Sequence, residues 1–390
     1  MICEAANHTG AWPAGENKMN NDEIPFSSNV ERLGLKQWAM VVLIIGAIAW
    51  GVPWLWPIPE GFAPSPNYRL PYALNGDYWM FEHWCDYAVK RYPCIMLGDS
   101  VLWGTYVKKE ETLAQALNQT AGREISANLG VDGLHPAAMA GLIKYYAPAL
   151  RNTRVIINLN PLWLTSTRLD LQEDKETLFN HTALVPQFFS KPRCYRAEFS
   201  ERVRNALSRK IPFARWLNHI NTASFNDMSL VEWATEHPYQ NPRKLFSKGI
   251  QFEDNEPHNP PAPWTAKGIG GQDYAWVELD QSYQWSSFKQ AVNILKSRNN
   301  EVLVIIGPFN GYMMTKESLA RYAAIKSAME SWLKQNNVSC YAVLELPSEF
   351  YADASQPVAE GYRLIAAEMR KTGFIESLSA PGGIHGGNAK

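Results

Sequence analysis

This sequence lacks the charge pattern of a nucleic-acid-binding protein. Its 37 Lys and Arg residues are balanced by 38 Asp and Glu residues, which gives a formal net charge of -1, and no long basic run is present. Proteins that bind nucleic acids usually concentrate basic residues on one surface, where they neutralise phosphates. Nucleic acid is therefore not an expected partner.

The sequence also lacks the usual motifs of a metal or phosphate site. Its five cysteines are scattered and form no CxxC pair, which excludes the common zinc and thioredoxin spacings. No glycine-rich phosphate loop is apparent, so we expect neither a metal nor another cofactor. Two states are open for Cys85 and Cys94: they are free thiols, or they form a disulfide if the body of the protein is exported.

Charged residues are missing altogether from one stretch near the N-terminus. Residues 37–58 contain none, and about 20 apolar residues suffice to cross a bilayer as a helix. Tryptophans lie near both ends of the stretch, at positions 38, 50, 54 and 56, as is typical of residues at the membrane interface. Residues 37–58 are therefore predicted to form a transmembrane helix.

The residues before this helix indicate its orientation. Arg32 and Lys36 favour a cytoplasmic N-terminus, which places the rest of the chain outside the cytoplasm. A cleaved signal peptide is the alternative, but such peptides begin close to the N-terminus, and 36 residues precede this stretch. We therefore expect a single-pass protein with an extracytoplasmic body, as in a bacterial cell envelope.

The chain is predicted to have several segments besides this helix. Residues 1–36 are polar and without apolar periodicity, which predicts a disordered tail. Residues 59–92 begin with several prolines and are predicted to be a stiff linker. Residues 93–375 are expected to form the main domain, and the glycine-rich residues 376–390 a flexible tail.

Within the main domain, short apolar runs alternate with helical patterns. Strands are predicted at 94–97, 125–128, 154–159, 301–306 and 339–344, and helices at 111–122, 136–150, 281–298, 316–336 and 357–371. This alternation predicts an α/β fold of three layers, in which a parallel sheet has helices on both faces. An insertion of about 165–280 interrupts it, and we expect this insertion either to form a lid over the ligand-binding edge or to be a surface excursion.

The sequence Leu-Gly-Asp-Ser-Val, residues 97–101, follows the first strand of the domain. Ser100 would stand where the strand ends, at the edge of the sheet at which α/β proteins bind ligands, and Gly98 permits a sharp turn there. Two further motifs, Asn-Leu-Gly ending at Gly130 and Asn-Leu-Asn ending at Asn160, follow the next two strands. These residues can supply hydrogen-bond donors to an oxyanion, although each taken alone is also a common turn residue.

The last motif is Asp353-Ala-Ser-Gln356-Pro, followed by Gly361-Tyr362. With the motifs above, it resembles the SGNH subgroup of GDSL hydrolases over residues 93–163 and 301–370, which implies a flavodoxin-like sheet. The resemblance implies that Ser100 is the nucleophile and that Asp353 orients the base. It also implies an oxyanion hole made by the amides of Ser100 and Gly130 and the side chain of Asn160.

Gln356 departs from the family pattern, because the family has histidine at this position. A glutamine amide is not basic near neutral pH and cannot accept the serine proton. Three explanations remain open: natural loss of catalysis, a deliberate inactivating replacement, or a substitute base. His135, after the second strand, is one candidate for that base, and His385, in the C-terminal tail, is another.

We therefore expect a membrane-anchored serine esterase or O-acyltransferase that acts on ester-linked acyl groups through an acyl-serine intermediate. The expected partners are an acylated small molecule or an extracytoplasmic glycan, together with the membrane through residues 37–58. The alternative is a catalytically inactive binding or scaffold protein that keeps the same pocket, and Gln356 is the residue that favours it.

Overall fold

Five short apolar segments form one parallel sheet in the computed structural model, which describes residues 33–225, 227–241, 253–371 and 373. The strands are β1 Cys94–Leu97, β2 Ser126–Asn128, β3 Arg154–Leu159, β4 Glu301–Ile306 and β5 Ser339–Ala342. Their order is β2-β1-β3-β4-β5, and every neighbouring pair is parallel. This is the flavodoxin-like order, so the predicted fold class is confirmed.

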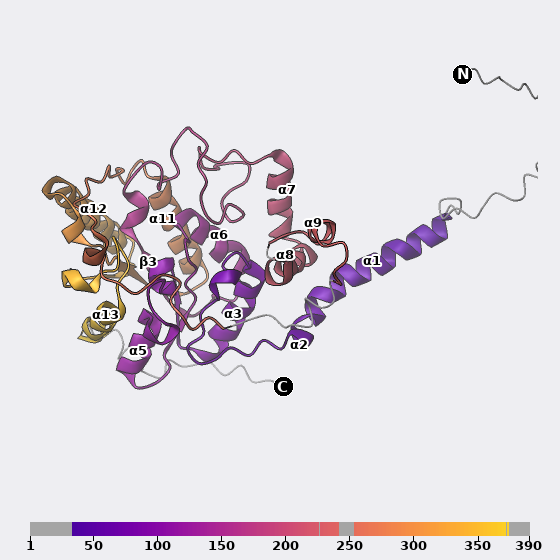
Figure 1. Cartoon of the computed structure of the whole chain (residues 1–390), viewed down its shortest axis with the longest axis horizontal. Coiled ribbons are helices and arrows are strands. Elements are labelled where there is room, and N and C mark those ends of the chain that lie inside the picture. Colours follow the sequence, from indigo (N-terminus) through magenta and orange to yellow (C-terminus); the bar gives the residue numbers. More distant parts are fainter. Residues whose placement is uncertain (1–32, 226, 242–252, 372, 374–390) are drawn as a thin grey trace, which may run out of the picture. The chain divides into compact units, whose positions relative to one another are not determined.

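Helices cover both faces of the sheet (Figure 1). On one face α3 Tyr78–Arg91, α6 Pro136–Tyr146, α11 Tyr283–Ser297 and α12 Lys316–Gln335 share a core with the strand residues Ile95 and Ile157. On the other face α5 Leu113–Ala121 and α13 Ala359–Lys371 pack on Met96 and Ile156. Successive strand residues thus point to opposite faces, and both faces are buried, as in other parallel α/β sheets.

The remaining helices are shorter or lie outside the sheet layers. They are α1 Leu35–Leu55, α2 Pro57–Glu60, α4 Ser100–Trp103, α7 Phe199–Ser208, α8 Pro212–Phe225 and α9 Leu230–Glu236. Short 3-10 helices are η1 Tyr72–Leu74, η2 Lys109–Glu111, η3 Pro161–Leu164, η4 Trp264–Lys267, η5 Gly311–Met313 and η6 Ser348–Phe350. The insertion therefore contributes α7 to α9 and η4, and α8 packs on α3.

The structure corrects the prediction that residues 59–92 are a linker. Residues 78–91 form α3, which buries six residues in the core: Trp79, Met80, Phe81, Trp84, Cys85 and Ala88. Asp77 caps this helix, because its carboxylate accepts a hydrogen bond from the Met80 amide at 3.0 Å. The proline run at the start of the segment concealed an amphipathic helix that belongs to the domain.

The chain divides into two compact units, residues 1–49 and 50–390. The apolar helix α1 has 21 residues and is long and apolar enough to cross a membrane by length and composition. Pro53 lies inside α1 rather than ending it. The tails predicted at 1–36 and 376–390 lie almost entirely outside the described residues, as does His385.

The cysteines of the described ranges form no disulfide. Cys85, Cys94, Cys194 and Cys340 are all free, and only Cys340 is exposed. Cys85 lies in α3 and Cys94 begins β1, and both thiols are buried in apolar surroundings. The alternative of a bridge between Cys85 and Cys94 is therefore not realised.

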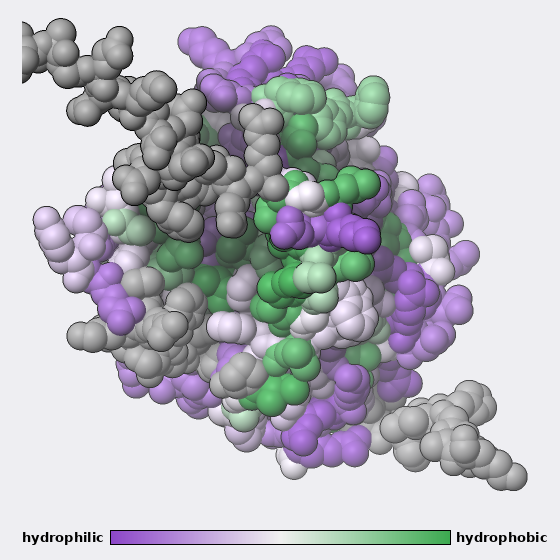
Figure 2. Space-filling view, turned by 90° about the vertical axis from the view of Figure 1, so that its right-hand side faces the viewer, coloured by the Kyte–Doolittle hydropathy of each residue, from purple (hydrophilic) through white to green (hydrophobic). Residues whose placement is uncertain are grey.

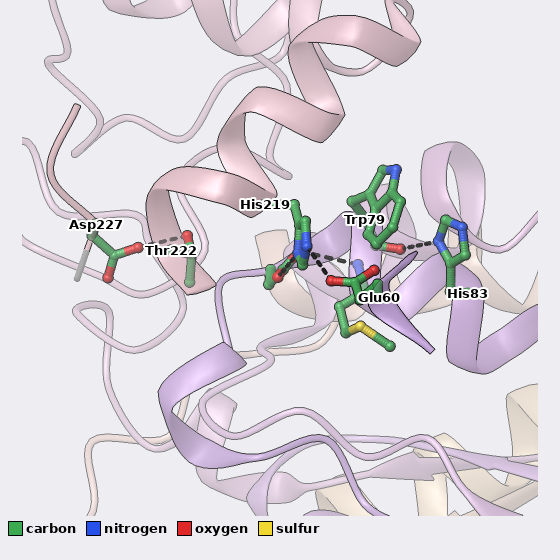
Figure 3. Close-up of polar contacts among 8 residues, drawn as sticks. Glu60, Trp79, His83, His219, Thr222 and Asp227 are labelled. Atoms are coloured by element: carbon green, nitrogen blue, oxygen red, sulfur yellow. Dashed lines mark hydrogen bonds and ion pairs between the residues drawn. The ribbon is translucent and has the colours of Figure 1, made fainter. Parts of the chain in front are cut away.

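A buried cluster of charged groups joins three segments of the larger unit (Figure 3). His219 of α8 contacts the Asp77 carboxylate through Nδ1 at 2.6 Å and the Glu60 carboxylate through Nε2 at 2.7 Å. The three side chains are between 0% and 4% exposed. Burial alone would lower the pKa of His219, but the two carboxylates raise it to about 10.

Candidate active site

Ser100 lies at the carboxyl end of β1, where the chain turns directly into α4. Asp99 caps α4, because its Oδ1 accepts a hydrogen bond from the Val101 amide at 3.0 Å. A Cβ atom at Gly98 would lie 2.7 Å from Cβ of Asn158, so only glycine fits between β1 and β3 at this point. The Ser100 side chain is thereby placed at the ligand-binding edge of the sheet, and the residue is 7% exposed.

Gln356 contacts Ser100 directly, although 256 positions separate them in the sequence. Its Nε2 donates a hydrogen bond to Oγ of Ser100 at 3.0 Å. Its Oε1 is buried and has no hydrogen-bond partner. The loop after β5 therefore brings the side chain at the base position to the serine, as the resemblance implies.

Asp353 lies beside this pair and shapes the loop that carries Gln356. Its Oδ1 accepts hydrogen bonds from the amides of Ser355 at 2.9 Å and Gln356 at 2.8 Å. Burial raises the pKa of Asp353, and these amides together with Lys267 and Tyr106 oppose the rise. The carboxylate thus holds the backbone at residue 356 in place.

Asn160 is held beside the Ser100 loop by a hydrogen bond to Asp99. Its Nδ2 donates to Oδ2 of Asp99 at 2.7 Å and to Oγ of Ser355 at 3.2 Å. The indole of Trp163 donates to the same Asp99 oxygen at 3.0 Å. Burial raises the pKa of Asp99 to about 6, in spite of these hydrogen bonds. Asp99 therefore fixes the orientation of Asn160, a role that the sequence motif did not indicate.

Gly130 is required by packing as well as by its position. A Cβ atom there would lie 2.3 Å from the amide nitrogen of Trp103, so no other residue fits against α4. Its own amide donates to Oδ1 of Asn128 at 2.8 Å. Gly130 and Asn160, the two expected oxyanion donors other than Ser100, are therefore already hydrogen bonded within the protein. An oxyanion would have to replace these acceptors, so the oxyanion hole stays a prediction.

His135 does not contact Ser100 by any hydrogen bond found among the described residues. It caps α6 by accepting from the Ala138 amide at 3.3 Å, and its Nε2 lies 3.1 Å from the carbonyl oxygen of Asn180. Burial lowers its pKa to about 3. Both ring nitrogens are thus engaged in holding the helix and the insertion together, and the geometry does not favour His135 as a substitute base.

Two residues at the site escaped the sequence analysis. Tyr106, six positions after Ser100, lies near Asp353: burial raises the pKa of the Tyr106 hydroxyl, and the Asp353 carboxylate adds to that rise. Lys267 of the insertion lies 4.3 Å from the centre of the Tyr106 ring and donates to the carbonyl oxygen of Ala352 at 2.8 Å. The end of the insertion therefore reaches the loops around Ser100 and Asp353. The only sequence signal for Tyr106 was its closeness to the serine motif.

The site thus brings together the hydroxyl of Ser100, the non-basic amide of Gln356 and the buried carboxylate of Asp353. Within the described ranges, no three His, Cys, Asp or Glu side chains are grouped so that they can hold a metal ion. A hydroxyl with nearby amide donors is the equipment of acyl transfer. The missing element is a group that accepts the serine proton.

No family model and no curated protein matches the chain. Among solved structures, it is similar to a protein from Desulfitobacterium hafniense described as lipolytic and of the G-D-S-L family, with TM-score 0.34 and 12% identity over 71% of this chain and 97% of that one. It is also similar to a carbohydrate acetylesterase family member from Sinorhizobium meliloti, with TM-score 0.30 and 11% identity over 73% of this chain and 98% of that one. Similarities this low do not transfer an activity, so function has to be inferred from the site itself.

Proposed function

We propose that the site around Ser100 is that of a serine esterase or O-acyltransferase which acts on ester-linked acyl groups. The observation that carries this proposal is the hydrogen bond of 3.0 Å between the side chains of Gln356 and Ser100. Asp353 stands next to it and bonds the amide of residue 356. This adjacency of a serine, the base position and a carboxylate supports the proposal, because nucleophilic acyl transfer uses these three groups side by side.

In the form with histidine at 356, each group has a defined task. The imidazole accepts the Ser100 proton while Oγ bonds to the carbonyl carbon of the ester, and the oxyanion takes donors from Ser100, Gly130 and Asn160. The carbonyl–oxygen bond to the leaving alcohol then breaks, and the alcohol receives the proton. Water completes hydrolysis of the acyl-serine, whereas the hydroxyl of a small molecule or glycan completes transfer.

Gln356 supports a second proposal, that the chain binds acylated molecules without turning them over. Its amide donates to Oγ of Ser100, and neither orientation of an amide provides a basic nitrogen. Ser100, Gln356 and Asp353 stay side by side while a proton acceptor for the serine is missing. The protein would then serve as a binding or scaffold component.

Replacing Gln356 distinguishes the two proposals. We expect Gln356→His to raise hydrolysis of p-nitrophenyl acetate by about 10²- to 10⁴-fold, the usual effect of a positioned general base. Gln356→Asn is the matched control, because it also lacks a basic nitrogen. The gain must disappear when Ser100→Ala is added, and a fluorophosphonate probe must label Ser100 in the histidine form. A histidine form without either reactivity contradicts the enzymatic proposal and leaves the binding protein.

We also propose that α1 anchors the protein in a membrane, with its N-terminus in the cytoplasm. A helix of 21 residues is about 30 Å long, which matches the hydrocarbon thickness of a bilayer. Only 6% of its most apolar window is buried within the protein, so the apolar side chains need another apolar surrounding. Retention in the pellet after alkaline carbonate extraction tests this anchor.

A further inference from the structure

Helix α7 of the insertion carries its apolar side chains outward. Phe199, Val203, Leu207 and Ile211 recur every four residues, which places them along one side of the helix and its continuation. Phe199 is 67% exposed, Leu207 49% and Ile211 43%. A surface helix of a globular protein normally turns such a stripe toward the core. In this protein three of the four residues of the stripe are exposed and Val203 is partly buried.

The opposite side of α7 is polar and buried, which fixes the helix in this orientation. Asn205 donates to Oε1 of Gln187 at 3.2 Å, and Ser208 is buried beside it. Arg209, just past the helix, is 6% exposed and donates to the carbonyl oxygen of Ala183 at 2.9 Å. Turning the apolar stripe inward would leave these buried polar groups without partners, at a large cost. The buried polar contacts of α7 therefore hold its apolar stripe toward the outside.

Two more aromatic side chains extend the stripe. Phe188 packs edge-on against Phe199 with ring centres 6.0 Å apart, and Phe189 is 90% exposed. The Arg202 guanidinium lies 5.7 Å from the centre of the Phe188 ring. We call this surface the α7 patch, and its apolar members are Phe188, Phe189, Phe199, Val203, Leu207 and Ile211. Figure 2 views the molecule from the side that carries α7 to α9 and from which α1 projects.

The charges around the α7 patch have a small positive excess. Between residues 198 and 211, Arg202, Arg204 and Lys210 are at least partly exposed, as are Glu198 and Glu201, whereas Arg209 is buried on the other side of α7. Arg204 and Lys210 are exposed, and Arg202 borders the aromatic rings. Exposed aromatic and aliphatic side chains interleaved with basic ones are typical of helices that lie in a membrane interface. The basic residues complement anionic lipid headgroups.

The C-terminal end of the α7 patch lies near the point at which the chain leaves α1. Trp56 directly follows α1, and its ring contacts that of Trp216 in α8, with centres 5.3 Å apart. Ile211 lies five residues before Trp216, which is about 8 Å along a helix. The contact of His219 with Glu60 holds the same two segments together. The end of the patch is therefore close to the end of the proposed anchor.

We propose that the α7 patch lies in the headgroup region of the bilayer that α1 spans, against anionic lipids. This inference rests on the proposed anchor. Phe188, Phe189 and Phe199 enter the boundary between headgroups and acyl chains, and Arg204 and Lys210 contact phosphates. Such docking fixes the insertion, which reaches the Ser100 site through Lys267, against the membrane surface.

Photo-crosslinking to lipid tests this placement on the full-length chain in phosphatidylcholine vesicles that contain phosphatidylglycerol. p-Benzoylphenylalanine replaces either Phe199 or Leu207. The matched control is Leu319 of α12, which is 41% exposed and lies across the molecule from α7 (Figure 1). Flotation of the vesicles first establishes that the chain is inserted, so failure of the anchor is seen before any crosslink is scored.

We expect lipid adducts at positions 199 and 207 to exceed those at 319 several-fold in floated vesicles. Arg204→Gln with Lys210→Gln should lower the adducts in anionic vesicles and leave those in pure phosphatidylcholine unchanged. Equal adduct formation at 199, 207 and 319 overturns the proposal. So do adducts that join two copies of the chain instead of lipid, because they assign the patch to self-association. Near-ultraviolet circular dichroism confirms that each variant is folded.

Discussion

Removing His219 of α8 should strongly destabilise the larger unit. His219 contacts the carboxylates of Asp77 and Glu60 at 2.6 and 2.7 Å in a site closed to solvent. His219→Gln leaves two carboxylates buried near each other without a cation. Loss of one partner from a buried charged group costs about 3–5 kcal/mol, and we expect a loss of that size at pH 7.

The pH dependence gives an independent magnitude. The carboxylates raise the pKa of His219 from 6.5 to about 10, against the effect of burial. A rise of this size corresponds to about 5 kcal/mol at about 1.4 kcal/mol for each pKa unit. Because the folded-state pKa is the higher one, this stabilisation is complete below pH 6.5 and is lost as the pH rises toward 10.

Urea unfolding in a mild detergent, followed by tryptophan fluorescence, measures both effects. The free energy of unfolding should fall between pH 6.5 and 10 in the original chain and should lack this fall in His219→Gln. Adding Glu60→Gln to that variant should recover part of the loss, because one buried charge is removed. His83→Gln is the control, since His83 is only partly buried and contacts the Trp79 carbonyl. Equal pH profiles for His219→Gln and the original chain would refute the reasoning.

Two further predictions concern the site. Gly130→Ala should lower the free energy of unfolding by about 1–3 kcal/mol, the range for overpacking, because its Cβ would lie 2.3 Å from the Trp103 amide nitrogen. Urea unfolding measures this loss, and Gly270→Ala is the control because a Cβ atom there lies in open space. Equal losses in the two variants would contradict the packing argument. In the Gln356→His background, Asp353→Asn should remove most of the gain of about 10²- to 10⁴-fold in kcat for p-nitrophenyl acetate, because the base needs its orienting carboxylate. An unchanged kcat would show that Asp353 has no such role.

Sequence predicted the positions of those site residues that come shortly after a strand. Each short apolar run that predicted a strand forms one, and parallel strands end at the same edge of a sheet. Ser100 and Asn160 were found because they come directly after β1 and β3. The contact of Gln356 with Ser100 was implied only by the resemblance, since no local pattern relates residues 256 positions apart.

Other roles depended on partners that local sequence does not specify. The serine motif assigns no role to Asp99, and only packing of β1 beside β3 shows that its carboxylate accepts a hydrogen bond from Asn160. His135 was read as a candidate base, and the approach of the insertion turned its ring toward Asn180 instead. An aspartate or a histidine can serve a structural or a catalytic role, and the groups that it contacts in the folded protein determine which.

The sequence by itself determined the strands, their alternation with helices, the apolar helix near the N-terminus and the place of Ser100 at the edge of the sheet. These follow from local spacing of apolar residues and from short motifs. Only the tertiary structure decided that residues 78–91 belong to the core and that α7 turns its apolar stripe outward. Periodicity gives a helix an apolar side, but which side is buried depends on the polar partners that meet the other one, here Gln187 and Ala183.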